Sequence, residues 1–258
     1  MKICRYSIDG LVGYGEISGG EVRALDERLA TTGTNFPVGS VQILAPANPS
    51  KIVCVGRNYA EHAKELGNDV PAEPLLFLKA PSSIVSDGEV IAIPPQSSRV
   101  EHEAELAVVI ARSCKNLSET DDPFDHVLGY TCLNDVTARD LQKTDVQFTR
   151  AKSFDTFCPI GPYIETELDV TDIGVTCRVN GEIRQYGRTS QMVFSVAFLI
   201  RYISRQMTLN AGDVIATGTP AGVSIMESGD VCVVEIDGIG ILSNTVLSTG
   251  GLLKAENE

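Results

Sequence analysis

Residues 100–110 read Val100-Glu101-His102-Glu103-Ala104-Glu105-Leu106-Ala107-Val108-Val109-Ile110, an acidic start followed by an unbroken apolar run. The run predicts a strand that is buried on both faces. Because side chains alternate along a strand, we expect the three glutamates on one face and His102, in a structural role, on the other. Carboxylates gathered where a buried strand leaves the core raise one another's pKa unless a cation is present. A solvated acidic strand end is the alternative interpretation.

A second apolar run ends in a carboxylate at residues 128–135, LGYTCLND, and a helix-like segment follows at 136–142. Asp135 combined with the glutamates offers oxygen ligands, which suit Mg²⁺ or Mn²⁺ and fit zinc poorly. For Asp135 alone, capping the start of a helix is the simpler interpretation.

Residues 56–65, GRNYAEHAKE, contain one of the three histidines of the chain. If residues 58–66 form a helix, His62 and Glu65 are three positions apart and share a face. A carboxylate that orients an imidazole makes a general base. His126 lies in a polar turn, so we expect it at the surface.

A loop rich in glycine and threonine, ATGTPAGV at residues 216–223, follows a predicted strand at 213–215. Such a loop can offer backbone N–H groups and hydroxyls to a carboxylate, although an ordinary tight turn has the same composition. The loop lacks the Gly-Lys-Ser/Thr ending of a phosphate loop, and no GxGxxG follows a strand elsewhere, so no nucleotide cofactor is indicated.

The rest of the chain is rich in predicted strands. Residues 2–45 read as short strands separated by glycines, and prolines interrupt the pattern near residues 45–50. We therefore predict a small β-rich domain at 1–48 and a larger domain at 49–258. Asn180-Gly181 and Asp237-Gly238 predict hairpins, and the apolar spacing over 190–206 predicts a helix. Because strands do not alternate regularly with helices, the class is mixed α/β and β-rich, not a doubly wound parallel sheet.

Composition excludes several classes of protein. The 258 residues are 43% hydrophobic and 21% charged, which is typical of a folded globular chain. A net charge of −13 disfavours nucleic acid and anionic lipid as partners. No apolar stretch is long enough to span a membrane, and the first residues do not resemble a secretory signal. Seven cysteines without a CxxC pair suit a reducing compartment, so we expect a cytoplasmic protein with buried thiols.

Six segments together closely resemble the fumarylacetoacetate hydrolase family. The segments are VGRNYAEHAKELG (55–67), PLLFLKAPSS (74–83), VEHEAELAVVIAR (100–112), LGYTCLNDVTARDLQ (128–142), RAKSFDTFCPIGP (150–162) and DVIATGTPAGV (213–223). The resemblance covers about residues 50–247. It implies a mixed β-sandwich roll that holds a divalent metal, with a small N-terminal domain that varies among members, usually in a homodimer.

Carried over to this sequence, the resemblance implies a role for nine residues. Its metal carboxylates fall on Glu103, Glu105 and Asp135, which leaves Glu101 as a neighbour. Its catalytic histidine and orienting glutamate fall on His62 and Glu65, on a short helix that orders over bound substrate. Lys152 matches a lysine near the metal, Gln142 and Thr219 match positions that contact substrate, and Arg57 is expected as a further contact.

The function implied first is a Mg²⁺- or Mn²⁺-dependent hydrolase. It would cleave a C–C bond in 2,4-dioxo acids of the acylpyruvate type through a metal-stabilised enolate, with water activated by His62. The alternatives are an oxaloacetate decarboxylase or an isomerase of 2-hydroxyhepta-2,4-diene-1,7-dioate or 5-carboxymethyl-2-hydroxymuconate. A metal-binding scaffold without chemistry is the third interpretation, and the retention of all the proposed groups speaks against it.

Overall fold

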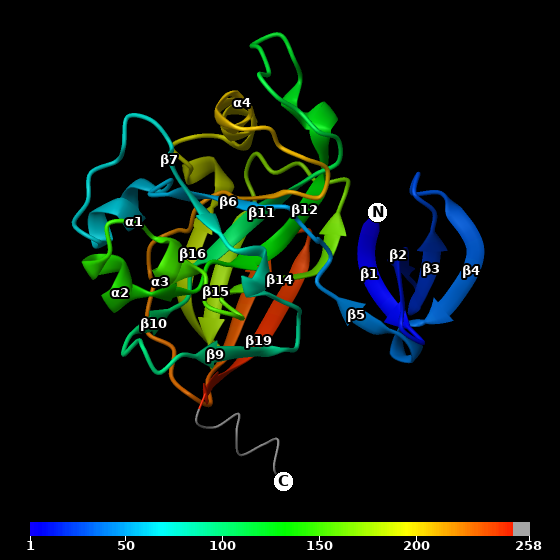
Figure 1. The fold of residues 1–258 in the computed structure, drawn as a ribbon, viewed down its shortest axis with the longest axis horizontal. Coiled ribbons are helices and arrows are strands. Elements are labelled where there is room, and N and C mark those ends of the chain that lie inside the picture. Colours follow the sequence, from blue (N-terminus) through cyan, green and yellow to red (C-terminus); the bar gives the residue numbers. More distant parts are fainter. Residues whose placement is uncertain (250–258) are drawn as a thin grey trace.

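The computed structural model describes residues 1–249, which form sheets of twelve, five and two strands with a few short helices (Figure 1). The strands are β1 (Lys2–Ile8), β2 (Leu11–Ser18), β3 (Glu21–Leu25), β4 (Thr31–Pro37), β5 (Gln42–Leu44), β6 (Ile52–Gly56), β7 (Leu75–Lys79), β8 (Ile84–Val85), β9 (Val90–Ile93), β10 (Val100–Glu101), β11 (Ala104–Ile110), β12 (Val127–Asn134), β13 (Thr137–Ala138), β14 (Cys158–Glu165), β15 (Gly174–Val179), β16 (Glu182–Arg188), β17 (Val214–Ala216), β18 (Val231–Ile236) and β19 (Gly240–Ser248). The α-helices are α1 (Ala60–Glu65), α2 (Arg139–Thr144), α3 (Thr149–Lys152) and α4 (Val196–Gln206).

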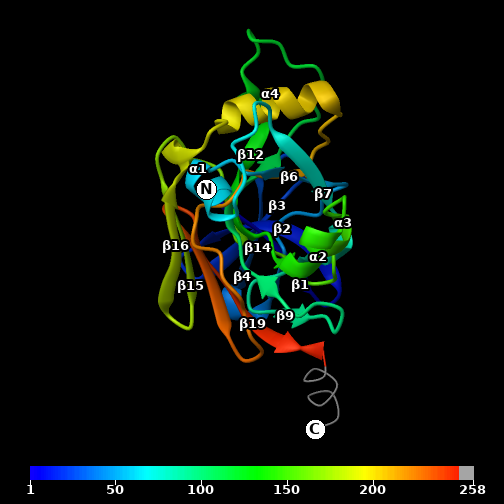
Figure 2. The same ribbon diagram turned by 90° about the vertical axis from the view of Figure 1, so that its left-hand side faces the viewer.

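Two sheets pack face to face. The larger has the order β4-β3-β2-β1-β14-β12-β11-β17-β6-β7, and the five-stranded sheet has the order β16-β15-β18-β19-β9. Strands β11, β12 and β14 contact β15, β18 and β19, so the two layers stand against each other (Figure 2). Most pairs are antiparallel, while β17 with β6, β19 with β9 and β14 with β8 are parallel. This mixed, β-rich sandwich agrees with the class predicted from the sequence.

Strand β11 is the centre of the core, and all seven of its residues are buried. Leu106, Val108 and Ile110 face the five-stranded sheet, while Ala107 and Val109 pack on the other face against residues such as Ile52 of β6. Alternation on a strand that is covered on both sides explains why this segment is apolar at nearly every position.

The first strands extend the large sheet away from the helices (Figure 1). β1 joins β14 through the pairs Lys2↔Glu165 and Ile3↔Ile164, and β2, β3 and β4 follow outward. Cys4, Tyr6, Val22 and Ala24 form a small core of their own. The domain boundary at residues 48–49 stays a prediction.

Both predicted hairpins are present, but only the first has the primed two-residue turn that the sequence predicts: three residues, 237–239, connect β18 to β19, and Asp237 does not have positive φ. Asn180 and Gly181 have φ of 52° and 82°, as a primed turn requires, between β15 and β16. The helix predicted over 190–206 begins only at Val196, because Ser195 caps it by accepting a hydrogen bond from the Phe198 N–H. The helix expected at 136–142 is displaced: residues 137–138 form β13, and α2 begins at Arg139.

Two further observations concern the whole described chain. All seven cysteines are buried and free of disulfides, as the sequence predicted. Among residues 1–249, no helix has the length and apolar character that crossing a membrane demands.

Candidate metal centre and active site

Three carboxylates meet where β11 begins and β12 ends. These strands are antiparallel, with Ala104 opposite Asn134, and the Asp135 N–H donates to the Glu103 carbonyl at 2.8 Å. Ligand oxygens of Glu103, Glu105 and Asp135 all lie within 4.8 Å of one another, and all three residues are buried. Antiparallel pairing thus brings together two acidic segments that are about thirty residues apart in the chain.

Buried cations neutralise two of the three carboxylates. Lys152 donates to Glu103 at 2.7 Å and to Asp135 at 2.6 Å, and Lys79 donates to the other oxygen of Asp135 at 2.6 Å. Arg139 forms a second ion pair with Glu103. Although burial opposes it, the charges of Lys152 and Arg139 hold the pKa of Glu103 well below its usual range.

Glu105 has no cationic partner in the described structure. It is 2% exposed and accepts a hydrogen bond from the Gly218 N–H at 2.8 Å. Burial, together with the charges of Asp135 and Glu103, raises the pKa of Glu105 well above its usual range. A divalent cation would supply the missing charge, and carboxylate oxygens are the ligands that hard cations prefer, so the three residues fit a metal.

His62 and Glu65 share one face of α1, as their spacing predicted. The His62 Nδ1 lies 3.4 Å from Glu65 Oε2, and Glu65 also accepts from the Gly222 N–H at 3.1 Å. Burial lowers the pKa of His62, although Glu103 and Glu65 oppose the shift. A lowered pKa favours the neutral imidazole, which is the form that can accept a proton.

The loop after β17 lies beside the carboxylates because β17 pairs with β11. The Thr219 hydroxyl donates to the Ala104 carbonyl at 2.8 Å and accepts from Gln185 Nε2 at 2.7 Å. Gln185 Oε1 also lies 2.9 Å from His102 Nδ1. His102 is thus buried on the far side of the strand from the carboxylates, in the structural setting that the sequence predicted.

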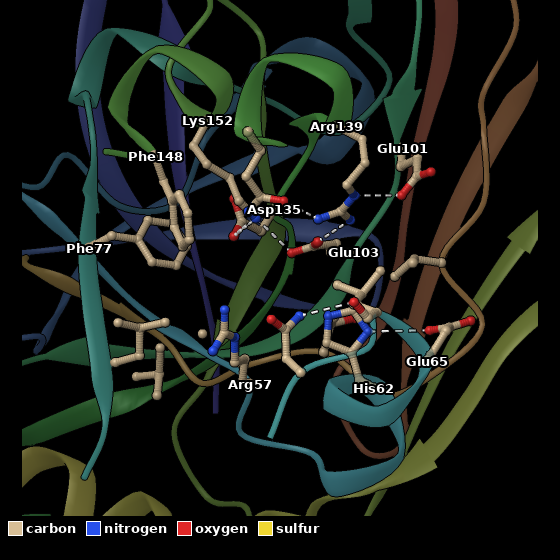
Figure 3. A pocket seen from close by; sticks show the side chains of 18 of the residues that line it. Arg57, His62, Glu65, Phe77, Glu101, Glu103, Asp135, Arg139, Phe148 and Lys152 are labelled. Carbon is tan, nitrogen blue, oxygen red and sulfur yellow. Dashed lines mark hydrogen bonds and ion pairs between the residues drawn. The ribbon is translucent and has the colours of Figure 1, made fainter. Parts of the chain in front are cut away.

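One cavity of about 490 Å³ is lined by all nine of the predicted site residues. Figure 3 shows Glu103, Asp135 and Lys152 on one side of it and His62 on the other, with Glu65 on the side of His62 away from Arg57. Gln142 accepts a hydrogen bond from Arg139 at 2.5 Å. Phe77 and Phe148, with ring centroids 5.5 Å apart, form an apolar wall.

Two family models match this chain. Residues 51–247 match the family described as fumarylacetoacetate (FAA) hydrolase, C-terminal. The chain belongs to the fumarylacetoacetate hydrolase family. Residues 1–46 match a second family, described as Rv2993c-like, N-terminal.

Relatives within the fumarylacetoacetate hydrolase family have different named activities. The oxaloacetate tautomerase YisK of Bacillus subtilis is 43% identical over 82% of this chain and 75% of its own. A 2-hydroxyhepta-2,4-diene-1,7-dioate isomerase from Mycobacterium marinum is 42% identical, with a TM-score of 0.89 over 97% and 99% of the two chains. A maleylpyruvate hydrolase from Sphingobium sp. SYK-6, in complex with manganese(II) and pyruvate, is 28% identical, with a TM-score of 0.78 over 96% and 99%.

Two buried cations, Lys79 and Arg139, were not predicted from the sequence, and Glu101 lies elsewhere than the predicted strand face. Lys79 ends the apolar strand β7, where a lone lysine could have been noticed, and Arg139 lies four residues after Asp135. The three glutamates do not share one continuous strand: Glu101 ends β10, Glu103 lies in the break at residues 102–103, and Glu105 belongs to β11. Glu101 binds Arg99 at 2.6 Å and Arg139 at 2.7 Å instead.

Proposed function

We propose that this protein is a divalent-metal-dependent enzyme that moves a proton between carbon and oxygen of a small 2-oxo acid, as a keto–enol tautomerase or isomerase. The observation that carries the proposal is the buried His62, which lies beside Glu65 in the same cavity as the carboxylate cluster. The names of the tautomerase and isomerase relatives support proton transfer over the acylpyruvate hydrolysis that the sequence favoured.

Glu103, Glu105 and Asp135 would hold Mg²⁺ or Mn²⁺. When bound, the cation would attract the C1 carboxylate and C2 oxygen of the substrate and stabilise negative charge on that oxygen. Lys152 holds Glu103 and Asp135 in place, because its ammonium donates a hydrogen bond to each carboxylate. We assign Gln142 and Thr219 to contacts with the substrate, since both line the cavity beside the carboxylates.

His62 would take the proton from C3 of the keto acid. The C3–H electron pair becomes the C2=C3 double bond, and the C2 oxygen then receives a proton, which gives the enol with no net gain or loss of atoms. Glu65 would stabilise the imidazolium formed during the transfer. The reverse sequence converts enol to keto acid.

Hydrolysis is the second candidate, because the same base could deprotonate water and because the maleylpyruvate hydrolase has a similar structure. Decarboxylation of oxaloacetate needs no base, so it would survive replacement of His62.

The homodimer and the cytoplasmic location stay predictions.

The test follows the enol absorbance of oxaloacetate with purified protein and Mg²⁺ or Mn²⁺, against metal alone, while pyruvate release is assayed in parallel. We expect acceleration of tautomerisation by the protein, loss with chelator, and loss in His62→Ala. Cleavage of acetylpyruvate without tautomerase activity would replace the proposal by hydrolysis. Pyruvate release from oxaloacetate that persists in His62→Ala would replace it by decarboxylation.

A further inference from the structure

The cations of the cavity differ in whether a carboxylate neutralises them. Lys79, Lys152 and Arg139 bond to the buried carboxylates, and Arg99 bonds to Glu101 at 2.6 Å. Within residues 1–249, Arg57 and Lys143 line the cavity without an ion pair or a side-chain hydrogen bond. Lys143 is exposed, whereas Arg57 is partly buried, so only Arg57 is a shielded positive charge without a counter-ion.

The backbone holds Arg57 firmly in its position. Arg57 has φ of 59°, a left-handed conformation that is unfavourable for a residue with a side chain. It lies between the end of β6 and Asn58, whose side-chain amide donates to Thr217 O at 2.7 Å and Phe194 O at 3.0 Å. The side-chain oxygen Oδ1 of Asn58 accepts from the Phe194 N–H at 2.8 Å. These bonds anchor the residue that follows Arg57 to two other segments of the chain.

The guanidinium faces the interior of the cavity. Figure 3 shows it pointing toward the side occupied by Asp135 and Lys152, between the Phe77–Phe148 wall and His62. A guanidinium presents two parallel N–H groups that match a carboxylate, and a low-polarity wall beside it strengthens that pairing. In the proposed function, the 2-oxo acid end of the substrate binds at the carboxylate cluster. Arg57 then faces the opposite end of the substrate.

We propose that Arg57 binds a second carboxylate of the substrate and makes the protein selective for 2-oxo dicarboxylates over 2-oxo monocarboxylates. This inference rests on the proposed function, because it assumes that the 2-oxo acid end binds at the carboxylate cluster. It also separates the candidate substrates, since simple acylpyruvates have no second carboxylate for Arg57 to bind.

The kinetic test compares oxaloacetate with its 4-ethyl ester, which keeps the 2-oxo acid and its enol but lacks the distal charge. In Arg57→Gln we expect kcat/KM for oxaloacetate to fall about 10- to 100-fold, with little change for the ester. Arg57→Lys should recover part of the preference, and Arg178→Gln, a surface arginine on β15, should change neither value. Equal losses on both substrates, or a selective loss in Lys143→Gln instead, would overturn the assignment.

A binding test separates this inference from the proposed function. Calorimetry of malate and 2-hydroxybutanoate, with Mg²⁺ present, compares two 2-hydroxy acids that differ by a carboxylate and cannot enolise. We expect the wild type to prefer malate and Arg57→Gln to lose most of that preference. A preference for malate without tautomerase activity would support the dicarboxylate site and contradict the proposed function. Tautomerase activity without a preference for malate would support the proposed function and contradict the role of Arg57.

Discussion

Asp135 is a buried carboxylate that bonds to two buried lysines. Lys79 and Lys152 each bond to a different oxygen of this carboxylate at 2.6 Å, and all three side chains are almost completely buried. Removing Lys79 would leave the buried Asp135 with Lys152 as its one remaining cationic partner and with an oxygen that has lost its charged donor.

Lys79→Met should therefore destabilise the metal-free protein by about 3–5 kcal/mol. Urea denaturation in the presence of chelator measures the change, and Lys115→Met, at an exposed lysine, is the control. The control should stay within about 0.5 kcal/mol of the wild type. A loss below about 1 kcal/mol in Lys79→Met would show that Asp135 does not depend on this lysine.

The pH dependence of turnover tests His62. A general base is lost as the pH falls through its pKa, and burial lowers the pKa of His62, so the acid limb of kcat/KM should lie below the usual value of about 6.5. Glu65 raises this pKa, so Glu65→Gln should move the limb to still lower pH and reduce the maximum. Glu61→Gln, on the exposed side of the same helix, should leave the limb in place. An acid limb above 6.5 would argue against His62 as the base.

Among the elements, the loop after β17 connects most parts of the site. Gly218 N–H binds Glu105, Thr219 binds the backbone of β11, and Gly222 N–H binds Glu65. Gly222 has φ of 105°, and a Cβ there would lie 2.0 Å from the Arg184 carbonyl oxygen. The loop thus requires glycine for both conformation and space.

Gly222→Ala should displace the loop and destabilise the protein. It should also lower kcat/KM about tenfold or more, because the N–H of residue 222 would no longer be placed to donate to Glu65. Gly229→Ala is a matched control, with φ of 101° but nothing within 4 Å of the added Cβ. It should cost only about 1 kcal/mol of conformational strain and preserve kcat/KM. Thermal unfolding and kcat/KM are measured for both variants. Equal losses of stability and of kcat/KM in the two variants would refute the steric argument.

For the whole molecule, the unbalanced charge at Glu105 links metal binding to stability. A ligand that binds only the native state stabilises it, by about 2.7 kcal/mol at a hundred times its dissociation constant. We expect Mg²⁺ or Mn²⁺ to raise the Tm of the wild type, chelator to reverse the rise, and Glu105→Gln to lose most of it. Glu101→Gln should keep the response, because Glu101 lies outside the ligand group. A wild-type Tm that is indifferent to both ions would contradict a metal site.

Several features of the fold and of the site could be predicted from the sequence, because each depends on a local pattern of residues. The apolar run of β11 predicted burial on both faces, the spacing of His62 and Glu65 predicted one helix face, and Asn180-Gly181 predicted a turn. Each of these follows from backbone periodicity or turn conformation within a few residues. The roles of the site residues came from a resemblance extending over six segments, and they stay predictions.

By itself, the sequence determined a β-rich fold, a strand at its centre and an acidic start to that strand. Tertiary structure alone decided which groups meet there. Lys79 reaches Asp135 across 56 positions of sequence, and the break at residues 102–103 turns Glu101 toward Arg139. The pairing of β11 with β12 and β17 places Asp135 and Gly218 beside Glu105. Such contacts depend on strand order and register across the whole sheet, which local periodicity does not encode.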